Sequence, residues 1–376
     1  MSNPPEAELT PRLDIDRIAS ARVMVVGCGA LGNEVLKNLV LSGVRRLVVV
    51  DNDLVEERNL CHSVLFRPSD IGLPKAHVAA TALQALAPDL DCRTIVGNVE
   101  HDVGLGLFAD CSVVVGCVDN RWARYCINRL CLRAATPWVD GAIAHLEGTA
   151  RVFAPGINCY ACSLGEEGEK EMQQHISCAD VAQAAVRQAH APTTVIAASL
   201  IGAVQAQEAL KIVSNGIASN SLIGHMFCYD GDVPQARLVR FQAWDDDCPV
   251  HELWSPVERM KIGIDHTVAE TLTAISEEIL GGEASEIALT DFSFVDFAEN
   301  RLSGEPVELM CPSFDVEKNL QNIFGNVDVN EYLCHNYSLL NAEFPYPDLS
   351  LRHIGFADEA VLRVNETRFI RLSACI

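Results

Sequence analysis

Long apolar runs are absent from this sequence of 376 residues. A membrane-spanning helix needs about 20 consecutive apolar residues, and polar residues interrupt every stretch before that length. The first ten residues are polar, contain two prolines and lack the apolar core of a signal peptide. We therefore expect a cytoplasmic protein that does not act at a membrane.

Positive charge is also scarce. The chain has 28 lysines and arginines against 51 aspartates and glutamates, which gives a formal net charge of −23. A field of this sign repels nucleic acids and anionic membranes, so neither is expected as a partner. It suits a basic protein partner, although an acidic surface also serves plain solubility.

The 15 cysteines do not indicate a disulfide framework. Their number is odd, and the chain is long and has no secretory signal. We therefore expect free thiols, metal ligands or a nucleophile.

The composition is that of a globular protein, 49% hydrophobic and 21% charged, and the length allows two or three domains. After a lead-in over residues 1–20, strand-like and helix-like stretches alternate through residues 21–251. This alternation predicts an α/β domain with a doubly wound, mostly parallel sheet of the Rossmann type. Residues 252–376 are acidic and end in short strand-like runs, so we predict a small separate α+β domain there. The predicted strands of the first domain are 23–26, 46–50, 92–96, 112–118, 138–140, 225–229 and 236–241, and its predicted helices are 33–42, 75–87, 121–135 and 193–213.

A glycine-rich turn stands between the first predicted strand and the first predicted helix. It contains Gly27, Gly29 and Gly32, and the next strand ends in Asp51. Glycines at this spacing allow a tight turn and let backbone N–H groups approach a phosphate at a helix N-terminus, while the acid can accept ribose hydroxyls. The pattern predicts nucleotide binding. The alternative is an α/β turn whose glycines serve packing alone.

Further polar residues fall at or just after predicted strand ends. A site that cleaves ATP needs carboxylates for magnesium, a lysine for the phosphates and donors for the charge that develops on the transferred group. Taken alone, each of these residues is more often a solvated loop residue than a catalytic one. Together they favour nucleotidyl transfer over hydride transfer. An NAD-dependent dehydrogenase would also need an acid/base pair that the sequence does not offer. The residues concerned are Asp51, Asp53, Asn59, Lys75 and Asp119.

Two pairs of metal-ligand type have the tight spacing that zinc prefers. They are Cys159-x-x-Cys162 and Cys248-x-x-His251. Three cysteines and one histidine leave no open position, which indicates a structural zinc site, a zinc knuckle. A redox pair at Cys159 and Cys162 is the alternative.

Cys178 follows Ser177 in a polar segment, shortly before a helix-like stretch. That placement can lower the pKa of a thiol and expose its thiolate. Cys178 is therefore a candidate nucleophile, although most cysteines are inert.

Taken together, these residues resemble the ThiF/MoeB/HesA superfamily, the activating enzymes of ubiquitin-like proteins. The resemblance covers residues 21–250. Its elements are the turn 27–32, Asp51-x-Asp53-x-Val55 with Asn59-Leu60, Lys75 after Pro74, Val118-Asp119-Asn120 with Ala123-Arg124, Cys159-Tyr160-x-Cys162, Pro192-Thr193-Thr194 and Gln205-x-Gln207-Glu208-Ala209-Leu210-Lys211.

The resemblance implies an enzyme that binds ATP and Mg²⁺ and adenylates the C-terminal glycine of a ubiquitin-like protein, releasing pyrophosphate. By position, Asp51 would hold the ribose, Asn59 and Lys75 the phosphates, and Asp119 the magnesium ion. Cys178 would capture the acyl group as a thioester. Asp53 and Asn120 fall at nucleotide-site positions of the same motifs, and Arg124 at a catalytic one.

Within the superfamily, the Ser177-Cys178 pair and the Pro192-Thr193-Thr194 start look most like bacterial activating enzymes of antiphage conjugation systems. The segment 163–192 would carry the catalytic cysteine, and residues 252–376 would help to recruit the conjugating enzyme. A homodimer is the usual assembly of such enzymes.

Two departures from the family pattern stand near the phosphates. His62 replaces an arginine and Ser63 replaces a glutamine, and a histidine carries full charge only below about pH 6.5. The family also uses an N-terminal arginine across the dimer interface, for which Arg12 and Arg17 are candidates. A sulfur-carrier adenylyltransferase of thiamin or molybdopterin synthesis, which stops at the adenylate, and a non-catalytic scaffold subunit are the alternatives.

Overall fold

The computed structural model describes residues 13–165, 168, 170, 172, 193–217, 222–241 and 244–374. These residues form two compact units. The first, called here the sheet unit, comprises the described residues up to Glu100, Leu107–Leu164, and those of 188–253. The second, the C-terminal unit, comprises His101–Gly106, the described residues of 165–187, and those from Trp254 onward.

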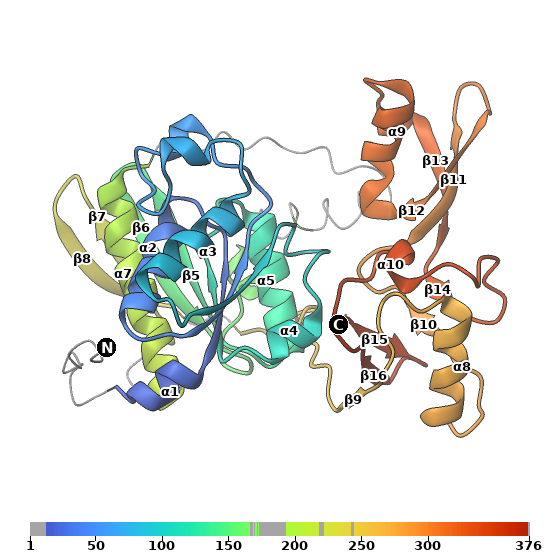
Figure 1. Ribbon diagram of the computed structural model, residues 1–376, viewed down its shortest axis with the longest axis horizontal. Coiled ribbons are helices and arrows are strands. Elements are labelled where there is room, and N and C mark those ends of the chain that lie inside the picture. The colour runs from blue at the N-terminus through green and yellow to red at the C-terminus, as the bar shows by residue number, and fades with distance from the viewer. Residues whose placement is uncertain are drawn as a thin grey trace. The chain divides into compact units, whose positions relative to one another are not determined.

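The sheet unit is built on one large sheet. Among the described residues it has eight strands in the order β3-β2-β1-β4-β5-β6-β7-β8. The first five run parallel, and β6, β7 and β8 are added antiparallel as a meander (Figure 1). The strands are β1 Arg22–Val26, β2 Arg46–Val50, β3 Asp91–Ile95, β4 Val113–Gly116, β5 Trp138–Ala144, β6 Glu147–Phe153, β7 His225–Asp230 and β8 Gln235–Arg240.

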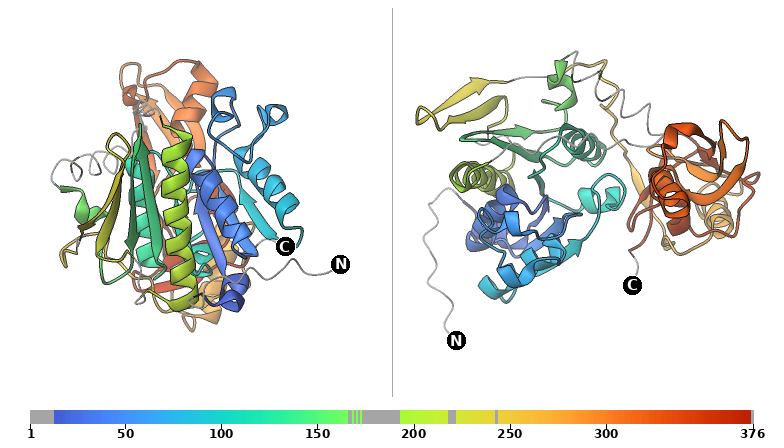
Figure 2. Two further views of the ribbon diagram at one scale, coloured as in Figure 1. Left: turned by 90° about the vertical axis from the view of Figure 1, so that its left-hand side faces the viewer. Right: turned by 90° about the horizontal axis from the view of Figure 1, so that it is seen from above.

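Helices cover both faces of this sheet. α2, α3 and α7 share one hydrophobic cluster with β1, β2 and β4, and α5 lies on the opposite face of the sheet (Figure 2). The Ile127 side chain of α5 lies close to Gly116 of β4. The helices are α1 Ile15–Ser20, α2 Ala30–Leu41, α3 Lys75–Leu86, α4 Leu105–Ala109, α5 Arg121–Arg133 and α7 Val195–Asn215, with 3₁₀ turns at Glu57–Asn59, Pro68–Asp70 and Ala161–Ser163.

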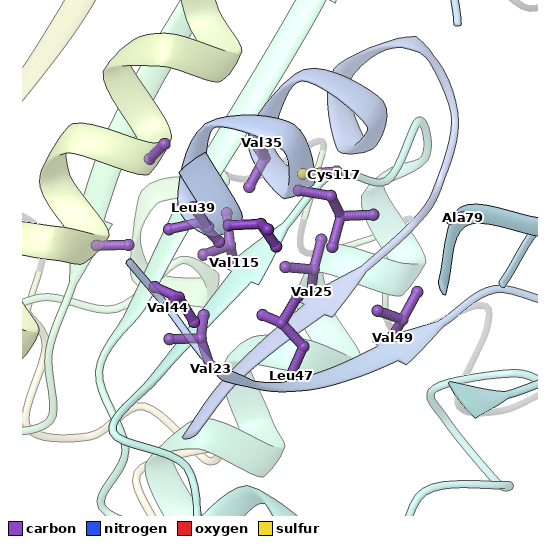
Figure 3. Packing of buried hydrophobic residues seen from close by; sticks show 14 of the residues in the cluster. Val23, Val25, Val35, Leu39, Val44, Leu47, Val49, Ala79, Val115 and Cys117 are labelled. Atoms are coloured by element: carbon purple, nitrogen blue, oxygen red, sulfur yellow. The ribbon is translucent and has the colours of Figure 1, made fainter. Parts of the chain in front are cut away.

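The core between α2 and the sheet consists largely of β-branched and leucine side chains. Figure 3 shows Val35 and Leu39 of α2 over Val23, Val25 and Val115 of the central strands, all fully buried. Strands that are covered on both faces read as continuous apolar runs, which is why 46–50 and 113–116 are easy to recognise in the sequence. Each such side chain contributes about 1.5–3 kcal/mol through burial.

α7 is long and apolar enough to cross a membrane by length and composition alone. It is instead a core helix of the sheet unit. Its side chains Ala198, Ile201 and Ala209 are fully buried, and Gln205 donates a hydrogen bond from Nε2 to the Gly116 carbonyl oxygen at 2.9 Å. The apolar character of α7 therefore follows from packing against α2 and strands β4–β6.

The C-terminal unit contains two smaller sheets in the described residues. One has five strands in the order β14-β10-β15-β16-β9, and the other has three in the order β12-β11-β13. Helix α8 packs into the core of the first sheet and α9 into that of the second. The elements are β9 Val257–Arg259, α8 Val268–Glu278, β10 Ile287–Ala288, β11 Phe294–Asn300, β12 Pro306–Pro312, α9 Val316–Phe324, β13 Tyr332–Tyr337, β14 Leu339–Leu340, α10 Leu351–Ile354, β15 Val361–Val364 and β16 Arg368–Arg371.

The C-terminal unit also includes a short segment from between β3 and β4. A Cβ atom at Gly104 would lie 2.1 Å from the Asp358 carbonyl oxygen, and the Gly106 N–H donates to the Glu359 carbonyl oxygen at 3.0 Å. Beside them Glu359 and Arg371 form a buried ion pair. The unit is therefore not continuous in sequence, and nothing in the sequence of residues 101–106 indicated this.

The predicted fold class, a mostly parallel α/β sheet with a small C-terminal α+β part, is confirmed. The sequence did not reveal β6, because Glu147–Phe153 mixes polar and small residues instead of forming an apolar run. The antiparallel part of the sheet therefore has one strand more than the predicted hairpin.

Candidate active site

The three glycines of the turn after β1 differ in their surroundings. Gly27 has a φ of +96°, and a Cβ atom there would lie 2.5 Å from the Cys117 carbonyl oxygen. A Cβ atom on Gly32 would lie 1.9 Å from the Gly27 carbonyl oxygen. Gly29, which precedes the first residue of α2, has no atom within 4 Å of the place a Cβ would take. Gly27 and Gly32 are thus needed for the turn itself, whereas Gly29 faces open space at a helix N-terminus, where an anion is stabilised.

Asp51, at the end of β2, holds this turn in place. Its carboxylate accepts the Cys28 N–H at 2.5 Å and the Asp53 N–H at 2.8 Å. Burial raises the pKa of Asp51, although the two N–H donors act in the opposite direction. The acid predicted to bind a ribose therefore also fixes the backbone of the glycine turn and of the loop after β2.

Asn33, in the first turn of α2, joins the glycine turn to the loop that carries His62. Its amide nitrogen donates to the Cys28 carbonyl oxygen at 2.7 Å, and its amide oxygen accepts the Leu65 N–H at 2.8 Å. Asn33 is fully buried. The sequence analysis did not single it out, because a helical asparagine carries no signal of its tertiary partners.

Asn59 and Lys75 are buried polar residues of the segment that follows β2. Asn59 is buried, and its amide oxygen accepts the Glu56 N–H at 2.8 Å, which leaves its amide nitrogen without a partner among the described residues. Lys75 begins α3, and its ammonium group donates to Asp53 at 2.7 Å. The Lys75 side chain is 9% exposed and the Asp53 side chain 63% exposed. An amide donor and a lysine are the groups that phosphate oxygens require.

His62 lies partly buried in this loop, with its Nδ1 atom 3.3 Å from the Cys61 Sγ atom. Burial lowers the pKa of His62, and the charges of Lys75 and Arg58 lower it further. The imidazole is therefore neutral near pH 7. Lys75 and Arg58 are two positive charges close to His62.

Asp119 follows β4 at the same edge of the sheet. Asn120 accepts the Ala123 N–H at 2.7 Å and so caps α5, and its amide nitrogen lies 3.3 Å from an Asp119 carboxylate oxygen. Arg124, one turn into α5, is buried and donates to Asp140 and to the carbonyl oxygens of Val118 and Gly141. The structure thus places Asn120 and Arg124 as supports of the Asp119 loop, and their direct roles in catalysis stay predictions.

The predicted zinc ligands come together. The ligand atoms of Cys159, Cys162, Cys248 and His251 all lie within 4.8 Å of one another. The Cys162 Sγ and His251 Nε2 atoms are 3.4 Å apart. Zinc bonds of ~2.3 Å to sulfur and ~2.0 Å to nitrogen would place tetrahedral ligands at about this separation. The His251 Nδ1 atom is buried and has no hydrogen-bond partner in the described part of the chain. This donor set fits a closed, structural zinc ion.

Neighbouring side chains orient the ligands. Asn128 of α5 donates from its amide nitrogen to Cys159 Sγ at 3.2 Å and accepts the Tyr160 N–H at 2.9 Å. The Trp244 ring stacks on the His251 ring at 3.6 Å between centroids. Such outer contacts fix the direction of ligand lone pairs. They could not be found from spacing in the sequence.

Two predicted residues lie outside the described residues, namely Cys178 and Arg12. The second candidate for the N-terminal arginine, Arg17, is described. Its guanidinium donates to the Ser214 carbonyl oxygen at 3.1 Å and pairs with Asp14. Arg17 is therefore engaged within its own chain.

Asp51 thus holds an open glycine turn at the carboxyl edge of a parallel sheet, while Asn59 and the Lys75–Asp53 pair follow β2 and Asp119 follows β4. The sequence pattern of the ThiF family matches residues 6–250, which is more than half of the chain.

The chain belongs to the ThiF family.

Several relatives agree with this assignment. The SAMP-activating enzyme E1 of Haloferax volcanii is 34% identical over 234 residues, covering 62% of this chain and 81% of the relative. The adenylyltransferase and sulfurtransferase MOCS3 of Mus musculus is also 34% identical, over 62% of this chain but only 48% of its own length. The sulfur carrier protein adenylyltransferase of Thermus thermophilus is 34% identical over 241 residues, covering 62% of this chain and 83% of the relative.

Solved structures support the fold. Escherichia coli MccB, in a structure with ATP, superposes with a TM-score of 0.50 at 21% identity, covering 63% of this chain and 68% of that chain. As a ThiF-family member the protein is an E1-like adenylyltransferase of an ATP-using family. The matched residues 6–250 include nearly all of the sheet unit, and the part of the C-terminal unit from Trp254 onward lies beyond them.

Proposed function

We propose that this enzyme activates a ubiquitin-like protein by adenylating its C-terminal glycine. The carboxylate of the glycine attacks the α-phosphorus of ATP, the bond to the β-phosphate oxygen breaks, and pyrophosphate leaves. The observation that carries the proposal is the open glycine turn held by Asp51, with the buried Lys75 after β2 and Asp119 after β4 of the same sheet, in a chain 34% identical to a SAMP-activating enzyme.

The residues present fit ATP and Mg²⁺. Gly29 leaves room where a phosphate would meet the N–H groups of α2. Lys75 and Asn59 offer donors for the phosphate oxygens, and Asp51 offers acceptors for the ribose. Asp119 and the exposed Asp53 supply carboxylate oxygens, the ligands that Mg²⁺ prefers. Bound Mg²⁺ would neutralise charge on the phosphates and on the departing pyrophosphate.

We propose further that Cys178 takes the acyl group from the adenylate, so that a thioester forms and AMP leaves. The thioester would then pass to the cysteine of a conjugating enzyme. Cys178 lies outside the described residues, so this step rests on the motif around it and on the relationship to enzymes named as activating enzymes E1. Assignment to a bacterial antiphage conjugation system, in the cytoplasm and as a homodimer, rests on the sequence resemblance alone.

The C-terminal unit is proposed to recruit the conjugating enzyme. One face of its three-stranded sheet carries α9, while the other presents Leu333, which is 58% exposed, and Phe297. Glu299 of β11 is the cross-strand partner of Leu333, and Glu308 of β12 is the cross-strand partner of Phe297. An exposed apolar surface with acidic neighbours suits a partner with a basic surface.

A second function is supported by two relatives. MOCS3 and the sulfur carrier protein adenylyltransferase are as similar to this chain, at 34% identity, as the SAMP-activating enzyme. In that case the protein would stop at the adenylate of a sulfur carrier protein, and Cys178 would have no part in the reaction.

Intact-mass spectrometry separates these two functions. The full chain is mixed with ATP, Mg²⁺ and a ubiquitin-like protein that ends in glycine, and samples are compared with and without reductant. We expect an adduct of enzyme and modifier that reductant removes and that Cys178→Ala lacks.

Cys228→Ala is the matched control, because Cys228 lies in β7, outside the motifs, and its variant should retain the adduct. An adenylated modifier without any thiol-bound adduct would instead establish the sulfur-carrier function. Neither species with any glycine-ending candidate would contradict both and favour a scaffold subunit.

A further inference from the structure

Arg124 holds the loop of Asp119 from both sides. Its Nη2 atom donates to the Val118 carbonyl oxygen at 2.6 Å, and its Nη1 atom lies 3.4 Å from the Asn120 carbonyl oxygen. These two carbonyl groups belong to the residues before and after Asp119. The guanidinium also donates to the Gly141 carbonyl oxygen at 3.1 Å, so the loop after β4 is tied to β5.

Asp140 of β5 fixes the orientation of that guanidinium. Its Oδ1 atom accepts from the Arg124 Nε atom at 2.9 Å, and its side chain is 1% exposed. A buried guanidinium is stable only when its charge is paired and its donors are used. Asp140 is the carboxylate that pairs with Arg124, and it uses the Nε donor, so the Nη donors are left for the carbonyl oxygens of the Asp119 loop.

Arg151 of β6 in turn fixes Asp140. The two residues are direct partners in the register of β5 and β6, and the Arg151 Nη2 and Nε atoms donate to Asp140 Oδ2 at 2.5 and 3.2 Å. The Arg151 guanidinium lies 5.3–5.7 Å from the ring centroids of Phe153, Tyr160 and Phe241. Cation–π contacts with these three rings restrict the position of the Arg151 guanidinium.

We infer that Asp140 and Arg151 are positioning residues for Asp119, acting through Arg124. The chain of contacts runs from Arg151 to Asp140, from Asp140 to Arg124, and from Arg124 to the carbonyl oxygens of Val118 and Asn120, the residues on either side of Asp119. Carboxylate placement within a few tenths of an ångström decides how well Mg²⁺ is held, because its octahedral geometry is strict. The inference rests on the proposed assignment of Asp119 to magnesium.

The test measures how much Mg²⁺ strengthens nucleotide binding. The dissociation constant of the full chain for α,β-methylene ATP is determined by calorimetry with Mg²⁺ and again with EDTA. The value with EDTA divided by the value with Mg²⁺ is the ratio that is compared among variants. A residue with a structural role alone changes the melting temperature but leaves this ratio unaltered. Asp119→Ala should bring the ratio close to one.

We expect Asp140→Asn to reduce the ratio about tenfold, because one charge-assisted bond to Arg124 is lost. Arg151→Met keeps the Asp140–Arg124 pair and should reduce the ratio about threefold. Arg151→Lys retains one donor for Asp140 Oδ2 and should restore most of it. Because Arg151→Met and Arg151→Lys are mild changes, the test stands even if Asp140→Asn does not fold.

The matched control is Glu359→Gln, which removes the carboxylate of a buried arginine pair in the C-terminal unit. It should lower the melting temperature and leave the ratio unchanged. If Asp119→Ala abolishes the Mg²⁺ effect while Arg151→Met and Asp140→Asn keep the original ratio, the inference is wrong and the magnesium site stands. If Asp119→Ala itself keeps the ratio, the magnesium assignment falls, and the inference falls with it.

Discussion

At the scale of single residues, the phosphate side of the site depends on few charges. His62 stands where the family pattern has an arginine, and its pKa is lowered by burial, by Lys75 and by Arg58. The folded-state pKa therefore lies below the ordinary value of about 6.5, so protonation favours the unfolded chain as the pH falls through that value. Near pH 7.5 the ring can donate one hydrogen bond but supplies no charge.

We therefore predict that His62→Arg accelerates adenylation at pH 7.5. A hydrogen bond to a charged group is worth about 1.5–3 kcal/mol, which corresponds to a rate increase of about tenfold or more. The measurement is ATP–pyrophosphate exchange in the presence of the modifier. The advantage over the unmodified chain should shrink once the pH falls below the lowered pKa of His62, because His62 then becomes protonated.

His62→Gln serves as the control for this substitution. Glutamine can donate but carries no charge at any pH, so its rate should match the unmodified chain at pH 7.5 and fall behind it only in acid. An arginine variant that is no faster at pH 7.5 would show that Lys75 and Arg58 already supply the charge.

At the scale of elements, the turn between β1 and α2 separates two uses of glycine. Gly32 has no room for a side chain, because α2 packs against the Gly27 carbonyl oxygen at this position. Gly29, in contrast, has an ordinary φ of −68° and open space around its Cβ position. Gly32 is therefore needed for packing, and Gly29 leaves room for a ligand.

This difference gives opposite predictions for two alanine variants. Gly32→Ala should destabilise the fold by about 1–3 kcal/mol or more, since overpacking forces the backbone to shift. Gly29→Ala should keep the unfolding free energy within about 0.5 kcal/mol of the original, as expected for a site without neighbours. Yet it should weaken ATP binding at least tenfold, because the methyl group enters the space before α2. Denaturant unfolding and calorimetric ATP titration measure the two quantities, and unchanged ATP affinity in Gly29→Ala would refute the ligand role.

At the scale of the whole molecule, the cysteine and histidine cluster joins distant parts of the sheet unit. The Cys162–His251 contact closes a loop of 89 residues that includes α7 and the β7–β8 hairpin. Closing so long a loop is entropically unfavourable, and a metal ion that binds only the folded chain offsets this. The three sulfurs and one imidazole nitrogen are suited to that purpose.

We predict that the purified protein carries about one zinc ion per chain, measured by elemental analysis. Removing it with a chelator should lower the melting temperature strongly, since a structural zinc contributes about 10 kcal/mol or more. Cys162→Ser should reproduce this loss. Cys228→Ser, outside the cluster, should retain both metal and stability, and a stable metal-free protein would rule out the zinc site.

The sequence alone determined those features that depend on local spacing. The order of strand, glycine turn, helix and acid is visible because β1, β2 and β4 are buried on both faces and α2 has one apolar side. The pairs Cys159–Cys162 and Cys248–His251 are visible because ligands of one ion recur at short intervals. These patterns sufficed for the fold class and for the family.

The tertiary structure decided what depends on contacts between distant segments. Asp140 and Arg151 face each other only because β6 returns antiparallel to β5, and Asn33 meets Leu65 only because the loop after β2 folds over α2. Residues 101–106 join the C-terminal unit through two glycines that let backbones touch. No periodicity in the sequence records such pairings, since each partner on its own is an ordinary polar or small residue.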